Sequence, residues 1–136
     1  DLREQAGLVY GVDSFLEVGK TRGIFGVAYA CDPPNVAKAR TLVERDLEEM
    51  RVRSVSSREL QQAKTLLLRQ VPLSESSWDR IGERLLRLSM EELPLDEPTR
   101  AVHRYQEITA AEVQAAFAKW IRPRDFVQVT VGPQPD

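Results

Sequence analysis

Apolar and polar positions follow two different periods along the chain, and the change divides a strand-like front from a helical middle. Residues 8–31 contain two runs rich in β-branched and aromatic residues, LVYGVDSFLEV and IFGVAYAC, separated by GKTRG. Such runs are typical of strands, and the glycine-containing segment between them is typical of a turn. The pattern therefore predicts a β-hairpin over residues 8–31.

Beyond residue 35 the apolar positions recur every three or four residues, which indicates amphipathic helices. The DPPN stretch interrupts the strand pattern and can start a helix, because proline fits the first helical turn. The buried stripe of the first helix is expected to contain Val36, Ala39, Val43, Leu47 and Met50. Four more helices are expected within residues 58–70, 74–90, 99–108 and 110–121.

Two capping boxes mark helix starts, Ser56 with Glu59 and Thr109 with Glu112. In this motif the hydroxyl and the carboxylate each satisfy a free backbone N–H group at the beginning of the helix. Pro72 is expected to disturb or end the helix that follows Ser56, because proline lacks the N–H group.

The last run, RPRDFVQVTVGP, is expected to form a closing strand between turn signals. The predicted order is thus two strands, five helices and one strand. This order favours an α+β fold, an antiparallel sheet with helices packed on one face, over a doubly wound fold. A single domain over residues 1–136 is expected, with no internal boundary.

The composition of the chain limits the classes of binding partner that are expected. The chain has 136 residues, 42% hydrophobic and 29% charged, and a net charge of −2, as in an ordinary globular domain. It has no basic stripe with interleaved aromatic residues, so nucleic acid is not an expected partner. Its uncharged runs are too short to span a membrane, so no membrane partner is expected either.

The chain carries few residues for chemistry of its own. Its one histidine, His103, has no second ligand at metal-binding spacing, and no glycine-rich loop could hold a phosphate. Cys31 ends an apolar run and is expected to be a small buried residue. Trp78 and Trp120 fall on apolar helix stripes and are expected in the core. Carboxylate clusters such as ERDLEEM alternate with arginine and are typical of solvated helix faces.

Two residues of the opening stretch, Arg3 and Tyr10, allow two interpretations. By period-two counting, Tyr10 shares a strand face with Leu8 and Val12 and could be a core tyrosine. Arg3 at a helix end would then interact with terminal carbonyl groups. Alternatively, guanidinium and phenol are both donors that can stabilise a carbonyl oxygen gaining negative charge. The pattern by itself favours the structural interpretation.

The order of motifs resembles the C-terminal domains of the pitrilysin/insulinase-like zinc metallopeptidases, which include the mitochondrial processing peptidases. LREQAGLVY resembles their R-E-x-x-G-L-x-Y segment, and VSSRELQQAKTLLLRQ resembles their S-x-x-E-L-x-x-A-K helix. The segments SESSWDRIGERL, LPLDEPTRAVHRYQEITAAEVQAAFAKWI and VQVTVGP follow in the family's order. The resemblance covers nearly the whole chain.

The resemblance implies a domain that binds no metal itself and acts beside a zinc-bearing one. Zn²⁺ would lie on an N-terminal-type domain or on a sibling subunit, and no cofactor is expected on this chain. Arg3 and Tyr10 match the family's arginine–tyrosine pair, which helps to bind a peptide substrate and to stabilise the tetrahedral intermediate. With the resemblance, the functional interpretation of this pair becomes the favoured one.

The resemblance also implies a homodimer or heterodimer, formed with the protein's own N-terminal region or with a zinc-bearing sibling. The family domain normally begins several dozen residues earlier, so the sequence is expected to be truncated at its N-terminus. An inactive scaffold or core subunit of a heteromeric complex is the alternative function. A helical module that binds peptides at its sheet edge is a weaker third. The compartment stays open, with the bacterial periplasm as first guess and the cytoplasm next.

Overall fold

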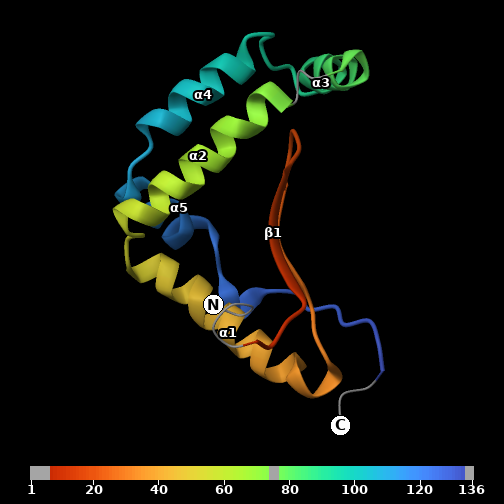
Figure 1. Ribbon diagram of the computed structural model, residues 1–136, viewed down its shortest axis with the longest axis vertical. Coiled ribbons are helices and arrows are strands. Elements are labelled where there is room, and N and C mark those ends of the chain that lie inside the picture. Colours follow the sequence, from red (N-terminus) through yellow and green to blue (C-terminus); the bar gives the residue numbers. More distant parts are fainter. Residues whose placement is uncertain (1–6, 74–76, 134–136) are drawn as a thin grey trace. The chain divides into compact units, whose positions relative to one another are not determined.

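The computed structural model describes residues 7–73 and 77–133, without the side chains of residues 71–73. These residues form two compact units (Figure 1). The first comprises residues 7–53 and 114–133, and the second comprises residues 54–113. Two antiparallel strands and five α-helices make the fold α+β, as the order of patterns predicts.

The first unit begins with the predicted hairpin. Strand β1, Gly11–Val18, pairs with β2, Gly23–Ala30, in a register that runs from Gly11 opposite Ala30 to Val18 opposite Gly23. The turn is closed by the N–H group of Gly19, which donates to the carbonyl oxygen of Arg22 at 2.9 Å. One face of β2 packs towards the core, because alternate residues of a strand share a face. These residues are Phe25, Val27 and Tyr29.

A short 3₁₀ helix, Pro33–Asn35, leads into α1, Val36–Val52. Three residues of the predicted stripe are buried, and Ala39 has no exposed surface. They form one cluster with residues that precede β1 and with a residue that follows α5. The cluster contains Leu8, Val9, Ala39, Val43, Leu47 and Ile121. Phe117 adds an edge-on contact to Phe25, with ring centroids 6.2 Å apart.

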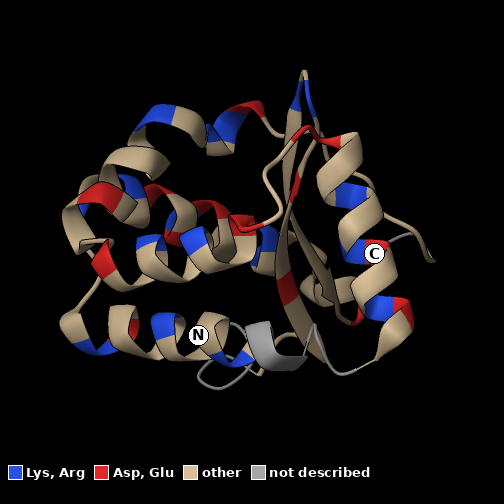
Figure 2. Ribbon diagram, turned by 90° about the horizontal axis from the view of Figure 1, so that it is seen from above, with Lys and Arg blue, Asp and Glu red and all other residues tan. Residues whose placement is uncertain are grey.

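Charged residues are spread over the helices (Figure 2). Arg40 pairs with Glu44 at 2.7 Å, and Arg51 pairs with Glu48 at 2.6 Å, both within α1. Exposed pairs of this kind contribute little to stability. The carboxylate run ERDLEEM therefore forms a solvated helix face, as predicted.

The second unit consists of α2, Ser57–Leu73, α3, Trp78–Met90, α4, Glu97–Glu107, and the first turn of α5, Ala110–Trp120. Helices α2 and α4 lie against each other. Between them Lys64 Nζ donates to the carbonyl oxygen of Gln106 at 2.8 Å, which satisfies a carbonyl group in the last turn of α4. Helix α2 extends one residue past Pro72.

Both predicted capping boxes are present. Ser56 N donates to Glu59 Oε2 at 2.8 Å, and Glu59 N donates to Ser56 Oγ at 3.2 Å. The same pair of bonds, with the same lengths, joins Thr109 and Glu112. The hydrogen bonds from the hydroxyl and the backbone lower the pKa of both carboxyl groups.

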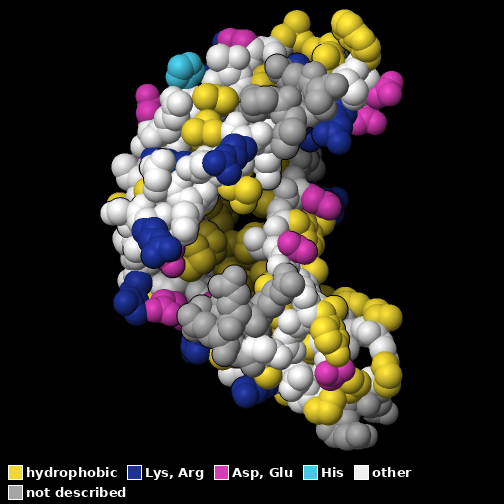
Figure 3. All heavy atoms as spheres, in the orientation of Figure 1, with side chains coloured by type: hydrophobic (Ala, Val, Ile, Leu, Met, Phe, Trp, Pro, Cys, Tyr) yellow, Lys and Arg dark blue, Asp and Glu magenta, His cyan; other side chains and the backbone are white. Residues whose placement is uncertain are grey.

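Two expectations are wrong. Pro123–Asp125 forms a 3₁₀ helix, and residues 126–131 pair with neither described strand, so the expected closing strand is absent from the described residues. Apolar side chains lie exposed on the surface near this end of the chain (Figure 3). Trp78 and Trp120 are 88% and 70% exposed, so neither belongs to a core. Each ring lies on the apolar stripe of its own helix, Trp78 on α3 and Trp120 on α5, but exposure this high means that little of the described structure covers either ring.

Candidate functional site

Only one member of the predicted pair can be placed. Arg3 lies outside the described residues, whereas Tyr10 is described in full. Tyr10 follows two consecutive buried residues, Leu8 and Val9, and precedes the first residue of β1. The candidate site is therefore described from Tyr10 outward.

The backbone fixes where Tyr10 lies. Gly7 has a φ of 57°, a left-handed conformation that glycine adopts without strain. The chain then buries Leu8 and Val9 together, and the Tyr10 N–H group donates to the carbonyl oxygen of Ala30 at 2.8 Å. The Tyr10 side chain is 68% exposed. The core-tyrosine interpretation is wrong, because neither Tyr10 nor Val12, its expected partner on one strand face, is buried.

The hydroxyl of Tyr10 has one described partner, an acid distant in sequence. It donates to Asp32 Oδ1 at 2.7 Å. This hydrogen bond, and secondarily the negative charge of Asp32, raises the pKa of Tyr10 above its ordinary value of 10.0. Both favour the protonated phenol. Tyr10 is thus a neutral hydroxyl at physiological pH.

Asp32 was missed as a site residue by sequence reasoning. It lies between β2 and two prolines at the N-cap of the 3₁₀ helix, a position where aspartate usually accepts a backbone N–H bond. Its side chain makes no such cap bond and accepts from Tyr10 instead. No local pattern could have revealed a bond across 22 residues.

Two residues near this pair, Tyr29 and Cys31, are less exposed than Tyr10 and Asp32. Tyr29 lies opposite Val12 in the ladder, and burial raises its pKa. Cys31 is a half-buried free thiol that packs against the core cluster, so it acts as a small apolar residue as expected. In the described structure the Tyr10 hydroxyl bonds to neither of these residues, which leaves Asp32 as its described partner.

The described residues do not fit a metal ion. Within residues 7–73 and 77–133, no three His, Cys, Asp or Glu side chains come together to hold one. His103 is exposed on α4. No helix in the same ranges is both long and apolar enough to cross a lipid bilayer.

The first unit has an open hollow of about 740 Å³. It is lined by Pro33 and Pro34, which directly follow Asp32, by the start of α1, and by Gln128 and Thr130. Its two charged residues, Arg40 and Glu44, pair with each other at 2.7 Å and so offset each other's charge.

Comparison with known proteins agrees with this fold. The sequence profile of the peptidase M16 inactive domain matches residues 1–67. The crystal structure of a peptidase M16 inactive domain from Pseudomonas fluorescens is 27% identical, with a TM-score of 0.78. The match covers 90% of this chain and 29% of that one, so this chain spans less than a third of that relative. No curated protein sequence gives a significant match.

These matches support an inactive, C-terminal-type domain of the M16 peptidases. Its α+β architecture is that of the M16 inactive domain. In this chain Tyr10 is exposed, and its hydroxyl donates to Asp32.

Proposed function

We propose that this chain is the non-catalytic domain of a zinc-dependent endopeptidase, and that Tyr10 and Arg3 bind the carbonyl group of the peptide bond to be cleaved. The observation that carries the proposal is the exposed Tyr10 hydroxyl, anchored by backbone pairing at the start of the hairpin. The similarity to M16 inactive domains supports it. The finer likeness to mitochondrial processing peptidases belongs to the same proposal.

The chemistry asked of Tyr10 is hydrogen-bond donation. A phenol that stays neutral can donate to an oxygen that gains negative charge in the transition state. Arg3, as a permanently charged guanidinium, would add a second donor. Zinc would be held by a partner domain or a sibling subunit, because the described residues offer no ligand set.

The test is peptide hydrolysis by the full-length assembly. Tyr10→Phe removes only the hydroxyl, and we expect kcat/KM for a short internally quenched peptide to fall about 10²-fold. Arg3→Ala should cause a loss of similar size. Tyr105→Phe, at a tyrosine on α4 in the other unit, is the matched control and should leave kcat/KM unchanged.

The opposite result has a clear meaning. If the assembly with Tyr10→Phe and Arg3→Ala hydrolyses the peptide as fast as the unchanged protein, the pair has no role in the reaction. The inactive scaffold subunit would then be the better account of this domain.

A further inference from the structure

The hydrogen bond to Asp32 places a constraint on what Tyr10 can do. A phenol hydroxyl has a single proton to donate. In the structure Tyr10 donates it to Asp32 Oδ1 at 2.7 Å, a distance typical of a bond to a charged acceptor. As it stands, the Tyr10 oxygen can offer other groups only its lone pairs. An oxyanion in the same place would meet lone pairs and a carboxylate, both of which repel it.

We propose that Asp32 is a positioning residue for Tyr10. In the resting protein its carboxylate accepts the hydrogen bond from the Tyr10 hydroxyl, and a substrate carbonyl oxygen replaces it as the acceptor when substrate binds. The inference rests on the proposed function of Tyr10 as a donor. It adds that donation requires the exchange of one hydrogen bond for another.

The Asp32 side chain accepts a hydrogen bond from Tyr10 and makes none to the helix that follows it. Asp32 occupies the N-cap position of the 3₁₀ helix, yet its carboxylate caps no backbone N–H group. Its backbone carbonyl alone serves the turn, by accepting from Asn35 N at 2.9 Å. Asp32→Asn therefore removes the negative charge that strengthens the bond to Tyr10 and leaves the turn's own hydrogen bond in place.

The geometry also allows the exchange to occur. Tyr10 and Asp32 both have exposed side chains, so the phenol can turn without disturbing a packed core. The Tyr10 backbone meanwhile stays fixed by its bond to Ala30. Apart from Asp32, the titratable group that acts on the Tyr10 hydroxyl is the more weakly coupled Cys31.

The first test reads the hydrogen bond directly in the full-length protein. Tyrosine labelled with ¹³C at Cζ gives one NMR signal per residue, and the Tyr10 signal is the one lost in Tyr10→Phe. In Asp32→Asn the pKa of Tyr10 should fall towards its ordinary value of 10.0. The pKa of Tyr29 should stay raised, because burial is its main cause.

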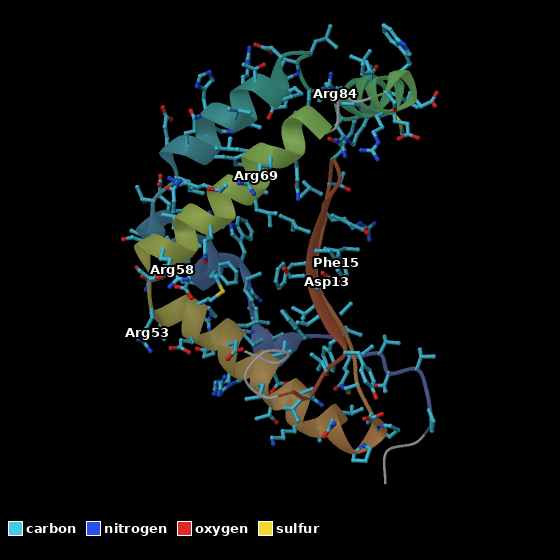
Figure 4. All side chains as sticks on the ribbon, viewed as in Figure 1. Asp13, Phe15, Arg53, Arg58, Arg69 and Arg84 are labelled. Carbon is cyan, nitrogen blue, oxygen red and sulfur yellow. The ribbon has the colours of Figure 1, made fainter. Side chains whose placement is uncertain are left out.

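Asp13→Asn is the matched control for this titration. Asp13 is an exposed acid on β1 of the same hairpin (Figure 4), and it is not among the groups that shift the pKa of Tyr10. The control should leave both tyrosine titrations unchanged. An unchanged Tyr10 pKa in Asp32→Asn would overturn the inference.

The second test reads the exchange in kinetics. A charge-assisted hydrogen bond is stronger than a neutral one by an amount that corresponds to about a fivefold to tenfold change in rate. Asp32→Asn should therefore raise kcat/KM for the quenched peptide by about that factor. In the Tyr10→Phe background the same substitution should have no effect, because the bond is already absent.

The outcomes separate the two claims. If Tyr10→Phe has no effect on hydrolysis, or the assembly cleaves no peptide, the function proposed for Tyr10 fails and the inference fails with it. If Tyr10→Phe slows hydrolysis and Asp32→Asn leaves it unchanged or slows it, only the role of Asp32 is overturned. A purely structural Asp32 would give a slower variant in both backgrounds.

Discussion

The ring of Phe15 on β1 lies over Gly26, its direct partner on β2. A Cβ atom added at Gly26 would come within 3.0 Å of three carbon atoms of that ring. Phe15 thus occupies the space that any other residue at position 26 would need for its side chain. An aromatic ring over a cross-strand glycine covers backbone that the glycine leaves bare.

This relationship predicts the effect of Gly26→Ala. The added methyl group must push the Phe15 ring out of its position, and overpacking of this kind costs typically about 1–3 kcal/mol. We expect the free energy of unfolding, measured by urea denaturation, to fall by an amount in this range.

The control for Gly26→Ala is the same substitution in a Phe15→Ala background. Without the ring there is no clash, and alanine is less costly than glycine within a strand. The loss should vanish or become a small gain. An equal loss in both backgrounds would show that the ring is not the cause.

The capping boxes predict a dependence of stability on acid. The pKa of Glu59 and of Glu112 is lowered in the folded protein, mainly by the hydroxyl groups of Ser56 and Thr109. Their stabilising contribution is therefore complete above the ordinary value of 4.5 and is lost as the pH falls through the lowered pKa. Thermal unfolding followed between about pH 6 and pH 2 should show this loss.

Glutamine variants give the comparison for the acid effect. Glutamine at either position can still accept the capping bonds but has no charge to lose. Glu59→Gln with Glu112→Gln should reduce the fall in melting temperature on acidification. A fall of unchanged size would mean that other carboxyl groups cause it.

The contact between α2 and α4 predicts a local effect of Lys64→Met. Methionine keeps the length of the side chain but cannot donate to the carbonyl oxygen of Gln106. We expect faster amide hydrogen exchange in the last turn of α4. Arg58→Met, near the start of α2 (Figure 4), replaces another cation of this helix. Among the described residues Arg58 makes no hydrogen bond to α4, so this variant should leave that exchange unchanged.

Local patterns predicted the elements that depend on neighbours in sequence. The hairpin, the helix stripe through Ala39, Val43 and Leu47, and both capping boxes follow from residues within a few positions of one another. A strand at residues 127–131 depends on a partner strand elsewhere, and a regular alternation cannot provide one. Likewise, the stripe that contains Trp78 shows which helix face is apolar but not whether anything packs on it.

The candidate site was predictable to a smaller extent. The resemblance around Tyr10 implied an accessible donor, and the side chain is exposed with its hydroxyl donating to Asp32. Asp32 could not be found in this way, because the hairpin brings it to Tyr10 from 22 residues away. Its position before two prolines is that of a helix N-cap, where it does lie, but its side chain makes no capping bond.

The unpaired segment after the second 3₁₀ helix has a practical consequence for making this domain. Val127, Val129 and Val131 are exposed beside backbone groups that no described strand satisfies, and no charged residue interrupts them. Such a segment is a template for intermolecular β-aggregation. Lysine at Val129 would act as a gatekeeper, and we expect it to raise the concentration at which the purified domain stays in solution.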